Sequence, residues 1–303
     1  MFFATNLQKC YFFNKSRKSA EYTVYPLFVL YSAGYRLLHR GYTFLHICTV
    51  LPVAQYPAAK VHSLPFLHIL LKREETAMAK IFVYDTVQNT LQTFYRQESE
   101  FMPYNTNGTM RVREFRGSSN SSVLWTTRQA MEAWNRTRAS YGSPIPFRYA
   151  FKRIWEGGHG LMSQHYAGTS FDVGQALTAT QRRNIYNVAR NSGLWGYVEP
   201  LSLTPTWVHF DRRYGRPACS TGYNTLRLNS RGCYVLILQD CLNTLGYSTA
   251  GLDGRFGPAT YRAVQNFQGD YNLTRDGIVG CSTWEKLCSR VKGNGSSSTT
   301  VDP

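Results

Sequence analysis

The strongest constraint on the fold is the helical periodicity of residues 224–291. Apolar side chains recur there at spacings of three and four residues in three successive segments, as they do in amphipathic helices. The segments begin at Ser230, at Gly257-Pro258 and at Ser282, and a proline suits a first helical turn. The Asp-Gly pairs between the segments suit turns with left-handed backbone. We therefore predict a small three-helix bundle.

Residues 78–215 show a mixed pattern. Residues 80–84 predict a strand. A helix is expected from Thr127, which can cap it, to Gly142, and a second one near residues 181–191. Short apolar stretches between these segments suit further strands. We therefore expect an α+β domain, joined to the bundle by a polar, turn-rich linker.

Residues 1–77 differ from the rest of the chain in composition. They hold four of the seven histidines and many Phe, Tyr and Leu residues, without a sustained period. The longest uncharged stretch, residues 41–59, contains two prolines and is a poor transmembrane span, and no signal-peptide pattern precedes it. The run Lys72–Glu75 before Met78 suggests a ribosome-binding site translated in frame. We interpret residues 1–77 as a non-native or poorly ordered extension; a genuine membrane or targeting segment is the alternative.

The net charge indicates which partners the chain can bind, and the cysteine spacing indicates which metal sites it can form. A net charge of +16 favours an anionic partner such as nucleic acid, an acidic membrane or a cell wall. The absence of zinc-finger spacing, RNA-binding aromatic motifs and dense Lys/Arg runs argues against nucleic acid. The seven cysteines form no Cys-x-x-Cys pair, which argues against a cysteine zinc site. Cys233 and Cys288 are expected to be buried thiols, and one disulfide among the five cysteines after residue 218 stays open for an exported protein.

Two of the three histidines after residue 77 lie in patterns suited to a metal. His165 and Asp172 form an HxxGxxxD pattern, and His209 lies in the segment WVHFD. Catalytic zinc takes three protein ligands and keeps a fourth position for water. Gly168 would let the chain turn so that His165 and Asp172 converge. A single histidine is more often an ordinary core residue, but this set predicts one Zn²⁺ site.

The run SQHYAGTSFD followed by WVHFD resembles the zinc D-alanyl-D-alanine carboxypeptidase and L,D-endopeptidase family, the Hedgehog-like peptidases, over about residues 127–213. The resemblance implies a Hedgehog/DD-peptidase-like zinc domain in which His165, Asp172 and His209 bind the metal. It also implies an arginine upstream of the first ligand that holds the substrate. Arg153 is the nearest match and Arg148 the second, although either could be a solvated surface charge.

The general base departs from the family pattern. Family members commonly carry an acidic residue or a histidine three positions before the last ligand, where this chain has Thr206, which cannot act as a base near neutral pH. Glu199-Pro200 resembles the family's Glu-Pro-Trp-His element with an inserted loop. We predict that Glu199 takes the proton from the attacking water. Asp211 and His159 are the alternatives, and Glu199 could instead be an exposed turn residue.

Residues 224–291 resemble the peptidoglycan-binding-domain-1 family. The resemblance rests on the following positions: Leu226, Gly232, Val235–Gly246, Leu252–Thr260, Val264, Phe267-Gln268, Asp276–Gly280 and Thr283-Trp284. It implies a wall-binding module whose ligand contacts would come from Arg255, Tyr261 and Asp276. Calcium is not expected, because neither Asp-Gly loop has a glutamate at its twelfth position.

The function predicted from these features is a zinc-dependent peptidoglycan peptidase, either a D,D-carboxypeptidase or an endopeptidase, that acts at the bacterial cell wall. The alternative is a noncatalytic peptidoglycan-binding protein with a structural or degenerate metal site, which Thr206 favours. The predicted organisation is an extension at residues 1–77, a zinc domain at 78–215, a linker at 216–223, the bundle at 224–291 and a disordered tail at 292–303.

Overall fold

The computed structural model describes β1 (Gln8–Lys15), β2 (Tyr22–Val29) and residues 78–293. The chain divides into two compact units, residues 1–69 and residues 70–303. In the first unit β1 and β2 form an antiparallel pair. The second unit contains the predicted zinc domain and the bundle.

Two predictions concern stretches that the structure covers only in part. Most of the extension at residues 1–77 and of the tail at residues 292–303 lies outside the described residues, so both remain predictions. Within the described parts of the chain, no helix combines the length and the apolar character needed to cross a bilayer.

The second unit opens with a three-stranded sheet of strand order β4-β3-β5. Its strands are β3 (Ala79–Asp85), β4 (Thr90–Arg96) and β5 (Val123–Thr127), with the short helix α2 (Val112–Arg116) between β4 and β5. α3 (Arg128–Tyr141) follows β5 directly. Thr127 caps it by accepting a hydrogen bond from the Ala130 amide, and Gly142 ends it with φ 76°. The strand and the helix predicted for this region are confirmed.

A second, antiparallel sheet has the strand order β6-β7-β9-β8. Its strands are β6 (Phe147–Tyr149), β7 (Ser170–Val173), β9 (Val208–Asp211) and β8 (Tyr197–Val198), and α4 (Ala179–Asn191) packs against β8 and β9. Phe171 and Phe210 lie in an aromatic core with Trp134 and Trp195. Because side chains alternate along a strand, the neighbouring residues Asp172 and His209 point to the opposite face.

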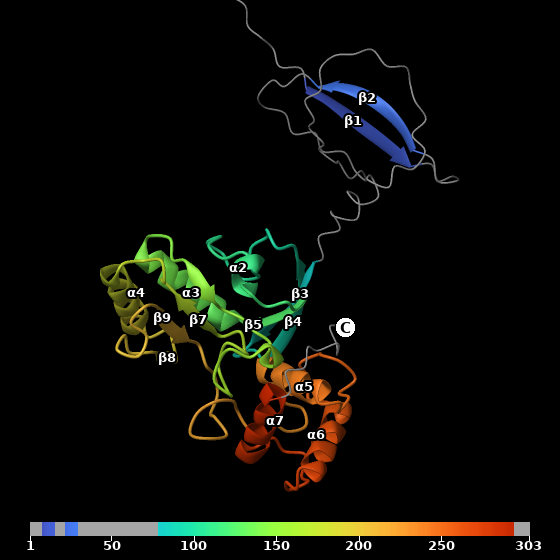
Figure 1. The fold of residues 1–303 in the computed structure, drawn as a ribbon, viewed down its shortest axis with the longest axis vertical. Helices are drawn as coiled ribbons and strands as arrows, with labels where there is room; N and C mark the ends of the chain where they lie inside the picture. The colour runs from blue at the N-terminus through green and yellow to red at the C-terminus, as the bar shows by residue number, and fades with distance from the viewer. Residues whose placement is uncertain (1–7, 16–21, 30–77, 294–303) are drawn as a thin grey trace, which may run out of the picture. The chain divides into compact units, whose positions relative to one another are not determined.

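The predicted three-helix bundle is confirmed. It consists of α5 (Cys233–Thr244), α6 (Pro258–Asp270) and α7 (Cys281–Gly293), drawn in orange and red in Figure 1. Every residue of α5 from Cys233 to Asn243 is buried. A helix that is buried on all sides needs partners all round. α5 finds them in α6 and α7 on the bundle side, and in β5 and the 3₁₀ helix η1 (Ile154–Glu156) on the other.

The bundle and the α+β part therefore share one core. The fully buried guanidinium of Arg153 makes two bonds to Asp240 of α5, Nη2–Oδ1 of 2.6 Å and Nε–Oδ2 of 2.8 Å. The predicted linker at residues 216–223 is not a free tether, because Cys219 is bonded to Cys281 and Tyr223 is buried. The two parts are consequently held against each other.

Candidate metal centre

Sheet register explains how distant residues meet at one point. Asp172 of β7 lies opposite His209 of β9, and Tyr149 of β6 lies opposite Asp172. On the other side of β9, the Glu199 amide donates to the His209 carbonyl at 2.9 Å, one position beyond the last pair of β8 with β9. Directly opposite residues in an antiparallel sheet carry their side chains on the same face. Tyr149, Asp172 and His209 therefore form one row across the sheet, and the backbone of Glu199 pairs with His209 at its end.

His165 reaches this row from a loop that turns sharply just before β7. The Gly168 amide donates to the His165 carbonyl at 3.1 Å, and Gly168 has φ 65°. A Cβ added at Gly168 would lie 1.9 Å from the Trp125 carbonyl oxygen, so only glycine fits this turn. The turn that the HxxGxxxD pattern predicts is present.

The three predicted ligands lie together. The carboxylate Oδ1 of Asp172 is 2.7 Å from His209 Nδ1 and 3.3 Å from His165 Nε2. Donor atoms about 2.0–2.2 Å from a tetrahedral zinc are separated by roughly 3.3 Å. His165 is 2% exposed, and among the described residues its Nδ1 has no hydrogen-bond partner. The donor types and the 3.3 Å separation fit a small cation that prefers nitrogen and oxygen ligands, whereas the 2.7 Å contact is a hydrogen bond that a cation would replace. Because Nε2 is the nitrogen that faces Asp172, the Nδ1 that lacks a partner within the described part of the chain is not a second donor to the same cation.

A fourth side chain, His159, belongs to the same cluster. Its ring stacks on that of His165 with 4.2 Å between centroids and meets the ring of Tyr149 at 5.3 Å. One donor atom each from His159, His165 and Asp172 lie within 4.8 Å of one another. Burial, and then the neighbouring His165, lower the pKa of His159 to about 3, so this ring is neutral at ordinary pH.

The charges of the cluster are strongly coupled. Burial alone would raise the pKa of Asp172, but hydrogen bonds with His165 and His209 outweigh it and lower the pKa well below its usual range. Burial lowers the pKa of His209, yet interactions with Asp172 and Asp211 raise it to about 9. The metal-free site thus pairs a carboxylate with an imidazolium, whose proton a bound cation would replace.

Asp211 lies behind His209 in the same strand. Its Oδ2 is 3.7 Å from His209 Nε2, which is beyond hydrogen-bond length, so the attraction is between charges. Arg213 holds this buried carboxylate with two bonds, Nε–Oδ1 of 2.8 Å and Nη2–Oδ2 of 2.5 Å. With both oxygens engaged by Arg213, Asp211 is better placed to orient His209 than to accept a proton from water.

The other predicted catalytic residues differ in their placement. Glu199 is partly buried, and its backbone amide bonds the His209 carbonyl. The assignment of Arg153 to substrate binding is corrected, because its side chain is fully enclosed and paired with Asp240. Arg148 is exposed, and its guanidinium lies 5.5 Å from the Tyr149 ring and 5.9 Å from the Trp207 ring, so solvent can reach it beside the row.

Asp240 and Tyr149 were not predicted from the sequence. A signal for Asp240 was present, since the otherwise apolar segment Val235–Leu242 contains Gln239 and Asp240 side by side. A buried acid on a core helix requires a partner. Tyr149 carried no comparable signal, because its position follows from the pairing of β6 with β7.

The ligand contacts proposed for the bundle lie in or near its two Asp-Gly turns. Tyr261 Oη donates to the Asp276 carbonyl at 3.3 Å, so these two residues are adjacent. The Asp276 carboxylate accepts bonds from Gln268 Nε2 and from the Ile278 amide, at 2.9 and 2.8 Å, and so helps to build its own turn. Arg255 is exposed.

Comparison with known proteins identifies the bundle. Residues 231–287 match the family described as "Putative peptidoglycan binding domain". The chain is 44% identical over 73 residues to the zinc D-Ala-D-Ala carboxypeptidase of Streptomyces albus G, covering 23% of this chain and 28% of that protein. It is 42% identical over 62 residues to the N-acetylmuramoyl-L-alanine amidase CwlM of Mycobacterium tuberculosis, covering 20% and 15%. It is 42% identical over 53 residues to the spore cortex-lytic enzyme of Oceanobacillus iheyensis, covering 18% and 19%.

The chain thus spans less than a third of each of these relatives, and the similarity lies over the bundle. It confirms the predicted peptidoglycan-binding module. The three relatives are named as a carboxypeptidase, an amidase and a cortex-lytic enzyme, so a shared binding domain does not specify the reaction. The chemistry of residues 78–215 is therefore determined by the residues of the metal centre.

Proposed function

We propose that this chain, whose residues 231–287 form a peptidoglycan-binding domain, is a zinc-dependent peptidase that hydrolyses stem-peptide bonds of bacterial peptidoglycan at the cell wall. His165, Asp172 and His209 would hold one Zn²⁺, and the reaction would be that of a D,D-carboxypeptidase or an endopeptidase. The observation that carries the proposal is the convergence of these three side chains, with 2.7 and 3.3 Å between donor atoms.

When bound, zinc would polarise the scissile carbonyl and acidify water. The protein's residues supply the remaining functions. Glu199, whose backbone pairs with that of His209, would take a proton from the attacking water, and its partial burial supports this role. Arg148 can meet an anionic group of the stem peptide from solvent. Asp211 and Arg213 keep His209 in position.

The bundle contributes by attachment to the polymer. Holding the enzyme on peptidoglycan raises the local concentration of scissile bonds at the metal centre. Because α5 is buried against β5 and η1, the metal centre keeps a fixed distance from whatever the bundle binds. A rigid arrangement of this kind would limit which bonds along the wall can be reached.

Purified sacculi digested with the zinc-loaded protein and analysed by mass spectrometry test the proposal and name the bond. Hydrolysis should require zinc, stop with a chelator, and be lost in His165→Ala and Asp172→Ala. Glu199→Gln should retain stoichiometric zinc and lose hydrolysis. If Glu199→Gln retains activity, the base is another residue; if the zinc-loaded protein releases no fragments, the peptidase proposal fails.

The second candidate function is noncatalytic wall binding. It is favoured by the position of His159, whose ring could occupy the corner that water needs in a catalytic site. Cobalt(II) in place of zinc distinguishes the two functions. If His159 is a ligand, His159→Ala will change the visible spectrum of the cobalt protein; if water holds that corner, the spectrum will be preserved.

A further inference from the structure

We propose that the Cys219–Cys281 disulfide, acting through Tyr223, positions the loop that carries His165, so that the metal centre is fully assembled only in the oxidised protein. The inference rests on the proposed function insofar as His165 is a metal ligand. Tyr223 and the disulfide are positioning elements and do not touch the metal themselves.

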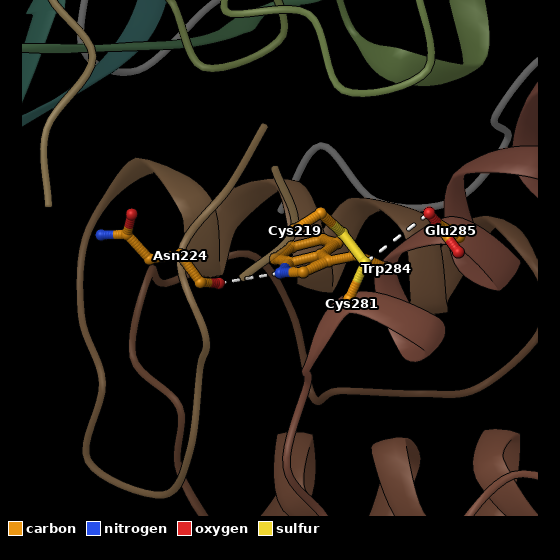
Figure 2. Close-up of a disulfide and its surroundings, with 5 residues drawn as sticks. All are labelled: Cys219, Asn224, Cys281, Trp284 and Glu285. Carbon is orange, nitrogen blue, oxygen red and sulfur yellow. Dashed lines mark hydrogen bonds between the residues drawn. A yellow bond between two sulfur atoms is a disulfide. The ribbon is translucent and has the colours of Figure 1, made fainter. Parts of the chain in front are cut away.

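The disulfide fixes one side of a small closed loop, residues 217–224, which we term the disulfide loop. Cys219 lies in this loop and Cys281 is the first residue of α7. The loop is closed by the Ala218 amide, which donates to the Tyr223 carbonyl at 2.8 Å. Figure 2 shows the disulfide beside Trp284, whose indole Nε1 donates to the Asn224 carbonyl at 2.8 Å. The disulfide loop is thus attached to α7 at two points.

The disulfide loop in turn holds residues 163–168, which we term the ligand loop. Tyr223 Oη donates to the Ser163 carbonyl at 2.9 Å, and Gln164 Nε2 donates to the Gly222 carbonyl at 3.1 Å. These are the two residues directly before His165. Tyr223 is fully buried, so its hydroxyl has a fixed position from which to hold Ser163. A displaced disulfide loop would therefore displace the first ligand.

The ligand loop has a second attachment that does not depend on the disulfide. Gln164 Oε1 accepts a bond from Tyr234 Oη of α5 at 3.1 Å, and Thr126 Oγ1 donates to the Gly168 carbonyl at 2.7 Å. Opening the disulfide would consequently loosen the ligand loop at its Ser163 end without unfolding it. The expected effect is weaker metal binding and not complete loss of the fold.

Among the described cysteines, those of the disulfide are the ones that a reductant in solvent can reach. Cys219 and Cys281 are partly exposed, whereas the thiols of Cys233, Cys241 and Cys288 are buried. A small dithiol would reduce the disulfide by exchange: the two protein thiols form while the dithiol, having supplied two electrons and two protons, becomes a cyclic disulfide. A disulfide-containing oxidant reverses the step. A reducing compartment would thus keep the site loosened and an oxidising environment would complete it.

Zinc affinity, measured by competition with a chromogenic chelator, tests the inference without relying on hydrolysis. The oxidised protein is compared with the double variant Cys219→Ser/Cys281→Ser. The variant should bind zinc about 10- to 100-fold more weakly, the range expected when a residue supporting a ligand is lost. Amide hydrogen exchange of residues 163–168 should become faster, while exchange in α3 should stay unchanged.

Tyr223→Phe provides a second, independent variant that leaves the disulfide intact. Loss of its hydroxyl bond to Ser163 should weaken zinc binding in the same direction under oxidising conditions. Tyr247→Phe, which removes an exposed hydroxyl bond to Asp270 in the bundle, is the matched control and should bind zinc as the wild type does. If the double variant does not fold, the wild type is reduced and its two accessible thiols are alkylated, which gives the same comparison and keeps the freed sulfurs beside Glu285 from binding zinc.

Each outcome bears on the inference. Equal zinc affinity and equal amide exchange in the oxidised and disulfide-free proteins would overturn it and leave the proposed function standing. Failure of the oxidised protein to bind one equivalent of zinc would overturn both. Weaker binding in the double variant and in Tyr223→Phe, with unchanged binding in Tyr247→Phe, supports the positioning role.

Discussion

The bundle and the metal centre are held together over very different distances along the chain. In the bundle, buried glutamines hold the two Asp-Gly turns: Gln239 bonds Asp253 at 2.7 Å, 14 residues away, and Gln268 bonds Asp276 at 2.9 Å, 8 residues away. In the metal centre, His209 meets Asp172 across 37 residues. Local pairs make the bundle a self-sufficient pattern, whereas the metal centre exists only after two strands and a loop have packed correctly.

This difference explains why similarity to known proteins is concentrated in the bundle. A short pattern with its turn partners close in sequence can be combined with different catalytic parts. Yet here the bundle is not independent, because α5 also packs against β5 and η1. The two regions thus differ in how they are built, but we expect them to unfold together.

The largest expected effect is on the free energy of unfolding, and it comes from breaking the Arg153–Asp240 pair. Arg153→Met leaves the Asp240 carboxylate buried without a partner, which should lower the free energy of unfolding by about 3–5 kcal/mol. If the regions form one cooperative unit, hydrogen-exchange protection should fall equally in α3 and in α7. Urea unfolding gives the free energy, and exchange followed by mass spectrometry gives the regional protection.

A double variant serves as the control for Arg153→Met. Arg153→Met/Asp240→Leu removes both charges, so it should recover much of the lost stability. Protection lost in α7 alone would show that the bundle opens independently and would break the claim of a single unit.

The sequence revealed the elements whose signals are local. The cap at Thr127, the stop at Gly142 and the proline at the start of α6 lie where the structure has those helix ends. Apolar spacing predicted all three bundle helices, although α5 begins at Cys233 and not at Ser230. These features depend on residues within a turn or two of each other.

Long-range features were harder to predict from the sequence. The pattern HxxGxxxD indicated that His165 and Asp172 would converge, but nothing local shows that β7 pairs with β9 in a register that places Asp172 opposite His209. Arg153 illustrates the failure most clearly. Its position before the first ligand suggested substrate binding, and its actual partner lies 87 residues away on a helix assigned to another domain.

The next largest effect is expected at the ligand loop, where a substitution should change zinc affinity as well as stability. Gly168→Ala introduces a Cβ into contact with the Trp125 carbonyl at a backbone angle unfavourable to alanine, and should cost at least about 2–3 kcal/mol of stability. Zinc affinity should fall with it because His165 moves. Gly142→Ala is the matched control: its φ is also positive but its Cβ would meet nothing within 4 Å. It should cost only about 1–2 kcal/mol, from the left-handed backbone alone, and leave zinc affinity unchanged. Equal zinc affinity in both variants would contradict the inference that the tight turn at Gly168 positions His165.

A smaller effect is expected where the bundle is held locally. Gln268→Ala removes the amide that bonds Asp276, Ile278 and the Gly277 amide, and should cost about 1–3 kcal/mol. Zinc affinity should not change, since this turn lies outside the metal centre. Gln265→Ala, on the same helix but partly exposed, should alter stability by no more than about 0.5 kcal/mol. If Gln268→Ala weakened zinc binding, the division between local and long-range construction would not hold.

The smallest expected effect is the change in zinc affinity and in metal-free stability with each unit of pH, and it should arise from the metal centre alone. The folded pKa of His209, about 9, lies above its usual value of 6.5, so the imidazolium stabilises the metal-free fold fully below pH 6.5. That contribution is lost as the pH rises from 6.5 through 9. Zinc must displace the same proton, so zinc affinity should instead increase, by about tenfold per pH unit, up to about pH 9.

Chelator competition between pH 7 and 9 measures the affinity, and thermal unfolding of the metal-free protein measures the opposite trend. Gln268→Ala should show both slopes unchanged. An affinity independent of pH over this range would mean that His209 is already neutral in the metal-free protein, and the charge pair with Asp172 would have to be rejected.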